Sequence, residues 1–314
     1  MMMKDTEMII FSGNSNKYLA QKICHYLDIP LGEAFVGEFS DGETRVELGN
    51  NVRGRDVFIV QSMSRPANHH IMEAAIMADA CRRSSAQRVT LVVPYFGYGR
   101  QERKSAPRTP ITAKLVADLI EASGFNRVLT MELHTSAIQG FFNIPVDHLY
   151  VKPVLSEYFG KLSNIMIISP DAGGVERARA MAKFFECSLA IIDKRRERPN
   201  ESEVMHLIGD VTGKDCLIID DIVDTGGTLV QAADAVLAHG AVSVSAAITH
   251  PVLSGPAVER IKHSKIKELI VTDSIPLSKE AHGCSQIVQL SLAELLGKAI
   301  RRIHNEDSIS SLFI

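Results

Sequence analysis

Two adjacent carboxylates, Asp220 and Asp221, precede a glycine-rich turn, Asp224-Thr-Gly-Gly-Thr228. A carboxylate is a poor partner for phosphate because like charges repel, but it suits the vicinal hydroxyls of a sugar or a magnesium ion. Glycines allow backbone N–H groups to approach a phosphate closely, and the threonine hydroxyls add further donors. The segment therefore predicts a site for a phosphorylated sugar.

The residues on either side of this turn predict the elements that hold it. The apolar run Leu217–Ile219 is typical of a buried parallel strand, and the pattern from Leu229 to Leu237 predicts a helix that ends at Gly240. We expect the two acids at the carboxyl end of the strand, where open α/β sheets bind ligands. The turn is not a Walker A loop, because no Gly-Lys-Ser/Thr follows it. The alternative is an ordinary strand, turn and helix cap, which the cost of desolvating two adjacent charges disfavours.

Two further predicted strand ends carry groups that bind divalent cations in proteins. Asp171 lies in the segment Ser169-Pro-Asp-Ala-Gly-Gly174, and His134 lies in Glu132-Leu-His-Thr135. Taken singly, the first also fits a simple capped turn and the second a structural, hydrogen-bonded histidine. Brought together in space, the carboxylate and the neutral imidazole would form a site for a divalent cation.

A basic run, Asp193-Lys-Arg-Arg-Glu-Arg-Pro-Asn200, follows the apolar segment at residues 189–192. A charge run of this kind is usually a solvated face. Its position at a strand end favours instead a mobile loop that closes over anions. Lys194 would supply a compact point charge and Arg196 a bidentate fork for phosphate oxygens.

Two glycine-containing segments combine aromatic rings with polar groups suited to a nucleotide. Residues 94–104 trail an apolar run and include Arg100 and Gln101, which could stack on a base or contact phosphates. In Phe39-Ser-Asp-Gly-Glu43 one aromatic ring stands beside two carboxylates that can accept hydrogen bonds from an exocyclic amine. Each segment alone also fits a common polar turn.

The bulk composition bounds the function. The 314 residues carry a net charge of −3, with 46% hydrophobic and 23% charged residues, as in ordinary globular proteins. The charge argues against a general nucleic-acid binder, and five scattered cysteines indicate neither a disulfide scaffold nor a zinc site. Because residues 1–7 lack the apolar core of a signal peptide and no run approaches a membrane span, we expect a cytoplasmic protein without membrane partners.

Short apolar segments alternate with helical patterns along the chain. Strands are predicted at residues 8–12, 57–61, 89–93, 127–131, 165–169, 189–193, 216–219, 243–249 and 268–271. Helices are predicted between them at residues 17–27, 70–83, 111–123, 174–185 and 228–239, with Gly124 and Gly240 as C-terminal caps. This alternation predicts an α/β fold of parallel sheets with helices on both faces. A boundary near residues 144–153 separates halves of similar element order, which predicts two tandem, related domains at residues 1–147 and 148–314.

Taken in order, these segments resemble those of the ribose-phosphate pyrophosphokinases, also called phosphoribosyl pyrophosphate synthetases, and the resemblance covers essentially the whole chain. The segments that carry it are Phe39–Glu43, Pro94–Gln101, Leu133-His134, Gln139–Phe142, Ser169–Gly174, Asp193–Arg196, Asp220–Thr228 and Leu295–His304. The acid and glycine loop alone fits any phosphoribosyltransferase, whereas the combination is specific to the synthetases. The resemblance implies that both domains have a phosphoribosyltransferase-like fold, each a mostly parallel sheet flanked by helices.

The resemblance also implies a reaction, in which the anomeric hydroxyl of ribose 5-phosphate attacks the β-phosphorus of ATP, AMP leaves, and 5-phosphoribosyl 1-diphosphate forms. It implies a ribose 5-phosphate site made of Arg196, Asp220, Asp221, Asp224, Thr225, Gly226, Gly227 and Thr228. It implies an ATP site made of Phe39, Asp41, Gly42, Glu43, Arg100 and Gln101. Magnesium would be bound by His134 and Asp171, and Lys194 and Arg196 would be catalytic, neutralising charge on the transferred group.

The family likeness further implies partners and assembly. The Phe39 segment of one subunit would enter the site of its neighbour, so we expect a homo-oligomer, specifically a hexamer. ATP and ribose 5-phosphate are the expected substrates, with inorganic phosphate and ADP as effectors. The chain departs from the family pattern at Asn68-His69-His70, where an acid commonly follows the asparagine, and at Glu132, where aspartate is usual.

Two alternative functions share this loop. A purine or pyrimidine phosphoribosyltransferase consumes the diphosphate, but such enzymes generally have one domain of about half this length. A non-catalytic, synthetase-associated subunit should have substitutions or insertions in the catalytic loops. Here all the residues assigned to chemistry are intact, which favours the enzyme.

Overall fold

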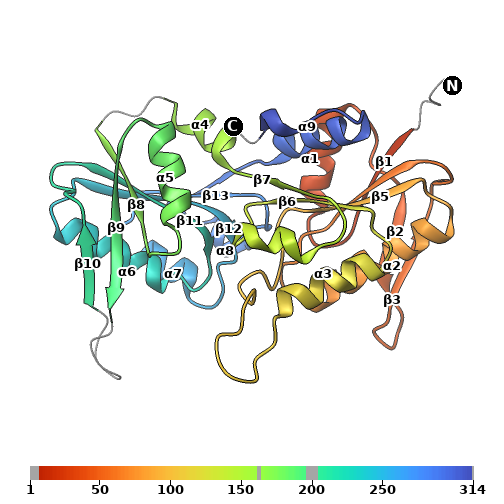
Figure 1. Ribbon diagram of the computed structural model, residues 1–314, viewed down its shortest axis with the longest axis horizontal. Helices are drawn as coiled ribbons and strands as arrows, with labels where there is room; N and C mark the ends of the chain where they lie inside the picture. Colours follow the sequence, from red (N-terminus) through yellow and green to blue (C-terminus); the bar gives the residue numbers. More distant parts are fainter. Residues whose placement is uncertain (1–6, 161–163, 196–203, 313–314) are drawn as a thin grey trace. The chain divides into compact units, whose positions relative to one another are not determined.

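The computed structural model describes residues 7–160, 164–195 and 204–312 (Figure 1). The chain divides into two compact units. The first comprises the described residues up to 153 together with 274–276 and those from 291 onward; the second comprises the described residues of 154–273 together with 277–290. The predicted boundary at 147 and 148 falls inside a strand, Val146–Leu149. The prediction also placed the C-terminal residues in the second domain, whereas they pack with the first unit.

The first unit is built on a five-stranded sheet in the order β1-β4-β5-β6-β7. All four pairings in it are parallel. Its strands are β1 Met8–Ser12, β4 Asp56–Val60, β5 Arg88–Val93, β6 Arg127–Met131 and β7 Val146–Leu149. The central strands β4 and β5 are mostly buried and apolar, as expected of a parallel sheet covered on both sides, whereas the edge strand β7 contains Asp147 and His148.

Helices cover both faces of this sheet, with α1 and α9 on one and α2 and α3 on the other (Figure 1). The bounds are α1 Lys17–Leu27, α2 Ala67–Arg83, α3 Thr112–Ala122 and α9 Ala293–His304, with short 3₁₀ helices η1 Ser136–Phe141 and η2 Ser310–Leu312. Polar contacts explain why α9 returns to this unit. The Arg88 side chain donates to the carbonyl of Ile303 at 2.9 Å, and His304 Nδ1 lies 2.9 Å from Asp56 Oδ2.

A separate antiparallel hairpin, β2 Ala34–Glu38 and β3 Thr44–Leu48, also belongs to the first unit. Its apolar side chains Val36 and Val46 pack against the core on the α2 side of the sheet. Ala34 and Leu48 pack against the same core, whereas the turn between the strands is exposed along its whole length. The hairpin therefore presents residues 39–43 to solvent on a short, packed support.

The second unit contains a seven-stranded sheet in the order β10-β9-β8-β11-β12-β13-β14. The β9–β10 pair is antiparallel and the other pairings are parallel. The strands are β8 Ile165–Ser169, β9 Ser188–Arg195, β10 Val204–Ile208, β11 Asp215–Val223, β12 Ser243–Pro251, β13 Leu269–Thr272 and β14 Ile287–Leu290. Helices α5 Val175–Phe184, α6 Gly227–Ala238, α7 Ala257–Lys262 and α8 Lys279–His282 belong to this unit, and α4 Lys152–Phe159 leads into it.

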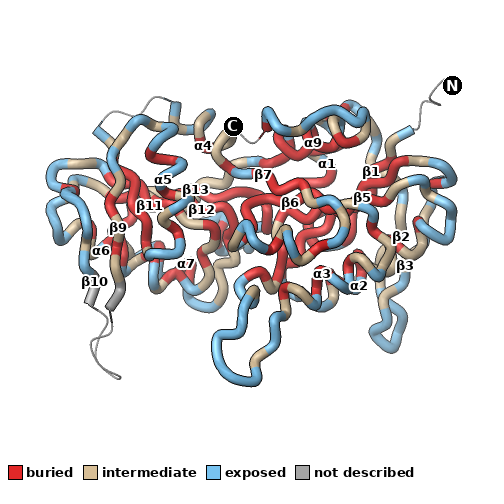
Figure 2. Tube along the Cα trace, in the orientation of Figure 1, coloured by how far each residue is buried: buried red, intermediate tan, exposed pale blue. Residues whose placement is uncertain are grey.

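Buried strands form the centre of each unit, as the burial colouring shows (Figure 2). The predicted strands 8–12, 127–131 and 165–169 and the predicted helix 17–27 have the same bounds in the structure. Gly124 and Gly240 follow helices with φ of +100° and +93°, the left-handed conformation of a C-terminal cap. The predicted α/β class with parallel sheets is confirmed.

No described helix combines the length and the apolarity that crossing a membrane requires.

Candidate active site

The two central carboxylates lie inside a strand rather than after it. Strand β11 continues through Asp220 and Asp221 to Val223, because its pairing with β12 continues: Asp220 is opposite Ile248, and Val223 is opposite Pro251. The prediction that the strand ends before the acids is therefore wrong. Both acids still lie in the last four residues of β11, so they are close to the glycine segment that follows the strand.

Residues of neighbouring loops fix the turn after β11. Ser254, which follows β12, donates its hydroxyl to Asp224 Oδ1 and its backbone N–H to the Asp224 carbonyl at 3.0 Å. Arg260 on α7 donates to the carbonyl of Thr225 at 2.9 Å. Gly226 has φ of +74° and begins helix α6 as its N-cap. A glycine is required there, because a left-handed conformation is costly for other residues.

The turn therefore directs the N-terminus of α6 toward the space beyond β11. The first backbone N–H groups of a helix lack partners within the helix, and the helix dipole makes this end electropositive. Together with the hydroxyls of Thr225 and Thr228 they are suited to bind a phosphate monoester. The acids of β11 stand on the strand that leads into the same turn, where they can accept hydrogen bonds from sugar hydroxyls.

A second strand end in the same unit contributes Asp171. It follows β8, which pairs directly with β11. Its Oδ1 accepts the backbone N–H of Gly174 at 2.9 Å at the start of α5, and Ser169 Oγ donates to its carbonyl at 2.7 Å. The structure therefore places Asp171 just after a strand that is adjacent to the one carrying the β11 acids.

Arg177 on α5 balances the two acids of β11. Its Nη1 lies 3.3 Å from Asp220 Oδ1 and 3.2 Å from Asp221 Oδ1. Burial raises the pKa of the Asp220 carboxyl to about 7, the charge of Asp221 adds to the rise, and Arg177 opposes it. Carboxyl groups whose pKa is raised in this way are common at sites that bind a ligand.

Of the two basic residues predicted to be catalytic, the structure describes the backbone of Lys194 only. Lys194 lies in β9, opposite Met205 of β10, so the prediction that it belongs to a loop is wrong. The strand extends past the apolar segment because antiparallel pairing with β10 supplies partners for its backbone. Arg196 lies outside the described residues.

In the first unit, the predicted adenine-binding residues form the tip of the β2–β3 hairpin. The Phe39 N–H donates to the Glu43 carbonyl at 2.8 Å, and the Glu43 N–H donates to Asp41 Oδ1 at 3.1 Å. Gly42 has φ of +90°, which closes the turn. The Phe39 ring is half exposed, with the Arg45 guanidinium 5.7 Å from its centroid. The turn therefore presents an aromatic face and two carboxylates outward.

Arg100, Gln101 and His134 occupy neighbouring positions at the ends of β5 and β6. Gln101 donates its N–H to the Tyr98 carbonyl at 2.8 Å, and Thr112 donates to Gln101 Oε1 at 2.7 Å. A Cβ added to Gly99 would lie 3.7 Å from the Cβ of His134, so the two loops are in contact. Arg100 and His134 are both exposed. The structure thus brings together the loop and the imidazole that the sequence singled out separately.

The atypical Glu132 has a structural position. It is 4% exposed, adopts φ of +37°, and accepts the Val151 N–H through Oε2 at 3.0 Å. The neighbouring Leu133 donates its N–H to His148 Nε2 at 2.8 Å. Glu132 therefore supports the loop that carries His134.

Three residues that hold this site were not identified from the sequence: Arg177, Ser254 and Arg260. Each stands in a segment with no motif of its own. Arg177 and Arg260 lie within helices, where a charged residue usually marks a solvated face. The signal that could find them is spatial, because Arg177 contacts the acids of β11, and Ser254 and Arg260 contact the turn that follows it.

The described residues contain no group of three or more histidines, cysteines or acids arranged to hold a metal ion. His134 belongs to the first unit and Asp171 to the second. The predicted pair is thus one ligand from each unit.

Comparisons with known proteins identify the family of this chain. The family model described as the N-terminal domain of ribose phosphate pyrophosphokinase matches residues 8–124, and the phosphoribosyl synthetase-associated domain matches residues 193–314. A curated ribose-phosphate pyrophosphokinase of Rhizobium meliloti (strain 1021) is 59% identical over 309 residues, which is 98% of this chain and 100% of the relative. The chain belongs to the ribose-phosphate pyrophosphokinase family.

Other ribose-phosphate pyrophosphokinases extend this result across distant organisms. The protein of Oceanobacillus iheyensis is 52% identical, with 99% of this chain and 98% of the relative covered. The crystal structure of phosphoribosylpyrophosphate synthetase from Mycobacterium smegmatis matches with a TM-score of 0.91 and 37% identity, covering 96% of this chain and 100% of that one. The predicted family is confirmed, and so is the fold class.

Proposed function

We propose that this protein transfers the β,γ-diphosphoryl group of ATP to the 1-hydroxyl of ribose 5-phosphate, giving 5-phosphoribosyl 1-diphosphate and AMP. It is a transferase of nucleotide biosynthesis, the role of its family. The observation that supports the proposal is the β11–α6 segment, in which a strand with paired acids leads through a glycine turn to the N-terminus of a helix.

Ribose 5-phosphate binds at this segment. The backbone of residues 224–228 and the two threonine hydroxyls hold the 5-phosphate, because donors and the positive end of α6 converge there. Asp220 and Asp221 accept hydrogen bonds from the 2- and 3-hydroxyls. This arrangement supports an orientation in which the sugar is held by both ends and its anomeric hydroxyl faces outward.

ATP binds through residues of the first unit. Phe39 and Arg100 sandwich the adenine, Asp41 and Glu43 accept hydrogen bonds from its edge, and Gln101 lies nearby. An aromatic ring and a guanidinium plane are suited to stack on a base. The exposed hairpin tip supports a role in the site of a neighbouring subunit, since it projects its aromatic face outward.

Magnesium is the proposed cofactor, held by His134 and Asp171 together with the ATP phosphates. Magnesium in phosphoryl-transfer sites commonly takes one or two protein ligands and completes its shell with water and phosphate oxygens. A compact site of three or more protein ligands is therefore not required. The bound ion would screen the polyphosphate charge so that a sugar hydroxyl can approach.

Lys194 and Arg196 neutralise the charge that develops on the transferred group. Phosphoryl-type transfer depends mostly on positioning and charge stabilisation, and each such group contributes about 10²–10³-fold in rate. Lys194 has a compact charge, and Arg196 can contact two phosphate oxygens at once. Exclusion of water around them would also limit wasteful hydrolysis of ATP.

We propose that the protein is a cytoplasmic homohexamer that phosphate activates and ADP inhibits. Helix α3 supports association, because Leu115 and Leu119 lie one turn apart on it and are 55% and 48% exposed, and Ile111, which precedes the helix, is 38% exposed. Light scattering should give a mass of six 34.4 kDa chains.

AMP release tests the function. The protein is mixed with ATP, magnesium and ribose 5-phosphate, without any purine or pyrimidine base. We expect AMP and 5-phosphoribosyl 1-diphosphate in equal amounts, and neither product when ribose 5-phosphate is omitted. Consumption of 5-phosphoribosyl 1-diphosphate with an added base would indicate a phosphoribosyltransferase instead. No turnover in either assay would indicate a non-catalytic subunit.

A further inference from the structure

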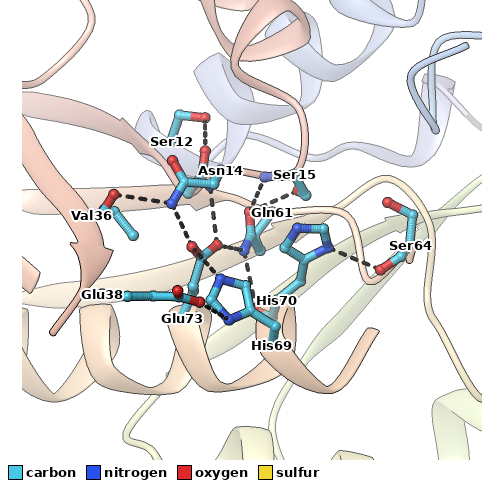
Figure 3. A network of polar contacts seen from close by, with 11 residues as sticks. Ser12, Asn14, Ser15, Val36, Glu38, Gln61, Ser64, His69, His70 and Glu73 are labelled. Atoms are coloured by element: carbon cyan, nitrogen blue, oxygen red, sulfur yellow. Dashed lines mark hydrogen bonds and ion pairs between the residues drawn. The ribbon is translucent and has the colours of Figure 1, made fainter. Parts of the chain in front are cut away.

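A buried carboxylate lies beneath the β2–β3 hairpin. Glu73 on α2 is 0% exposed, and its Oε2 accepts the Asn14 backbone N–H at 3.1 Å and Gln61 Nε2 at 2.6 Å (Figure 3). Its Oε1 accepts the Asn14 side-chain amide and lies 3.1 Å from His69 Nε2. A buried carboxylate is costly unless it is hydrogen-bonded in this way.

The rest of the network makes this position rigid. Gln61 Oε1 accepts both the backbone N–H and the hydroxyl of Ser15, at 3.1 and 2.7 Å. A Cβ added to Gly13 would lie 2.3 Å from Gln61 Oε1, so only glycine leaves room for this amide. Glu73 is therefore a fixed point of the first unit, tied to the loop after β1 and to the end of β4.

His69 connects this fixed point to the hairpin. Its Nε2 faces Glu73, and its Nδ1 lies 3.3 Å from Oε1 of Glu38 (Figure 3). One imidazole ring thus lies between a buried acid of the body and a half-exposed acid of the hairpin.

Glu38 is the last residue of β2 and immediately precedes Phe39. A second tether lies further from the turn, where Asn14 Nδ2 donates to the Val36 carbonyl at 3.0 Å. The Val36 side chain also packs against the core, which holds this part of the hairpin independently of the tip. The contact between His69 and Glu38 is therefore placed to restrain the tip rather than the base.

We propose that His69 is a positioning residue for the nucleotide, which holds the Phe39–Glu43 turn by joining Glu38 to the buried Glu73. This inference rests on the proposed function, because it takes the turn to be the adenine-binding segment. The contact already restrains the turn before a base stacks on Phe39, so the turn loses less conformational entropy on binding. It therefore favours nucleotide binding and leaves the sugar site unaffected.

A double-mutant cycle tests the proposal. His69→Asn shortens the side chain so that it cannot reach both acids, and Glu38→Gln keeps the length but removes the charge. We expect each variant to raise KM for ATP about three- to tenfold, with kcat and KM for ribose 5-phosphate within about twofold of the wild type. The double variant should equal either single variant, because both changes remove the same contact.

The chain offers a matched control. His263 Nδ1 also lies 3.3 Å from a glutamate four residues earlier, Glu259. His263→Asn should leave both KM values unchanged. A second measurement is independent of turnover: the sequence has no tryptophan, so Phe39→Trp places a single fluorophore in the turn. Its steady-state anisotropy without nucleotide should fall when His69→Asn is added.

Two outcomes overturn the proposal. One is an unchanged KM for ATP with unchanged anisotropy; the other is a parallel loss of kcat and of both affinities, which a merely structural role would cause. Wild-type protein that releases no AMP refutes the proposed function instead. In that case the anisotropy still decides whether His69 restrains the turn.

Discussion

Arg177 Nη1 lies 3.2 Å from Asp221 Oδ1, and this contact joins helix α5 to strand β11. The same nitrogen lies 3.3 Å from Asp220 Oδ1. The side chains are largely shielded from water, with Arg177 17% and Asp221 5% exposed. One guanidinium therefore balances two adjacent acids that repel each other, next to the proposed sugar site.

Removing this arginine should destabilise the fold. In Arg177→Ala the two acids keep their burial without their partner, so we expect the free energy of unfolding to fall by about 2–4 kcal/mol in urea titrations. Arg179→Ala, at an exposed position of the same helix, should change it by less than about 0.5 kcal/mol. Adding Asp220→Asn to Arg177→Ala should recover part of the loss. Equal effects of the two arginine substitutions would contradict the role of the contact.

The raised pKa of Asp220 predicts a stability change with a definite sign. In the unfolded chain an aspartate has a pKa of about 3.9, whereas burial first, and then Asp221, raise it to about 7 in the folded protein. Between these values the folded state binds a proton that the unfolded state has lost. Stability from this group is therefore greatest below about pH 4 and falls as the pH rises to about 7.

Asp220→Asn removes this titration. We expect the melting temperature of the variant, relative to the wild type, to be higher at pH 8 than at pH 5, measured with a chelator and without substrate. The same variant should bind ribose 5-phosphate more weakly, because it loses an acceptor for a sugar hydroxyl. A difference in melting temperature that does not change with pH would mean that Asp220 is not protonated more readily in the folded state.

The sequence predicts the strands that are apolar without interruption. Residues 8–12 and 165–169 have polar residues at both ends, so their bounds could be found from hydrophobicity alone. Strand β11 could not, because hydrophobicity ends at Ile219 while backbone pairing with β12 continues to Val223. The β2–β3 hairpin was missed for a related reason: its strands are half exposed and contain charged residues such as Arg45 and Glu47.

The sequence predicts the candidate site only in part, because some of its residues lie outside any local motif. The residues proposed to touch a ligand cluster in local motifs, so Asp171 and the 224–228 turn could be singled out in the sequence. Residues that act through another residue have no such motif. Arg177 and His69 are recognisable only when strand order and helix packing bring distant segments together.

Lys194→Ala should affect turnover far more than stability. Lys194 pairs with Met205 through the backbone, and alanine preserves that ladder. We expect kcat to fall at least about 10²-fold because a cation at the transferred group is lost, with little change in the urea midpoint. Lys183→Ala, an exposed lysine on α5, is the control and should retain full activity. Near-normal kcat in Lys194→Ala would refute its catalytic role.

Asp224→Ala should chiefly weaken the binding of ribose 5-phosphate. The Asp224 carboxylate accepts the Ser254 hydroxyl, and this contact fixes the start of the turn that leads to Gly226 and α6. Without it the backbone donors are less well ordered, so we expect KM for ribose 5-phosphate to rise about tenfold and KM for ATP to change by less than about twofold. Ser254→Ala removes the same hydrogen bond but leaves the carboxylate, and should give a smaller change in the same direction. Initial rates with each substrate varied in turn measure both constants, and an equal rise in the two would show that Asp224 supports the fold as a whole rather than the phosphate turn.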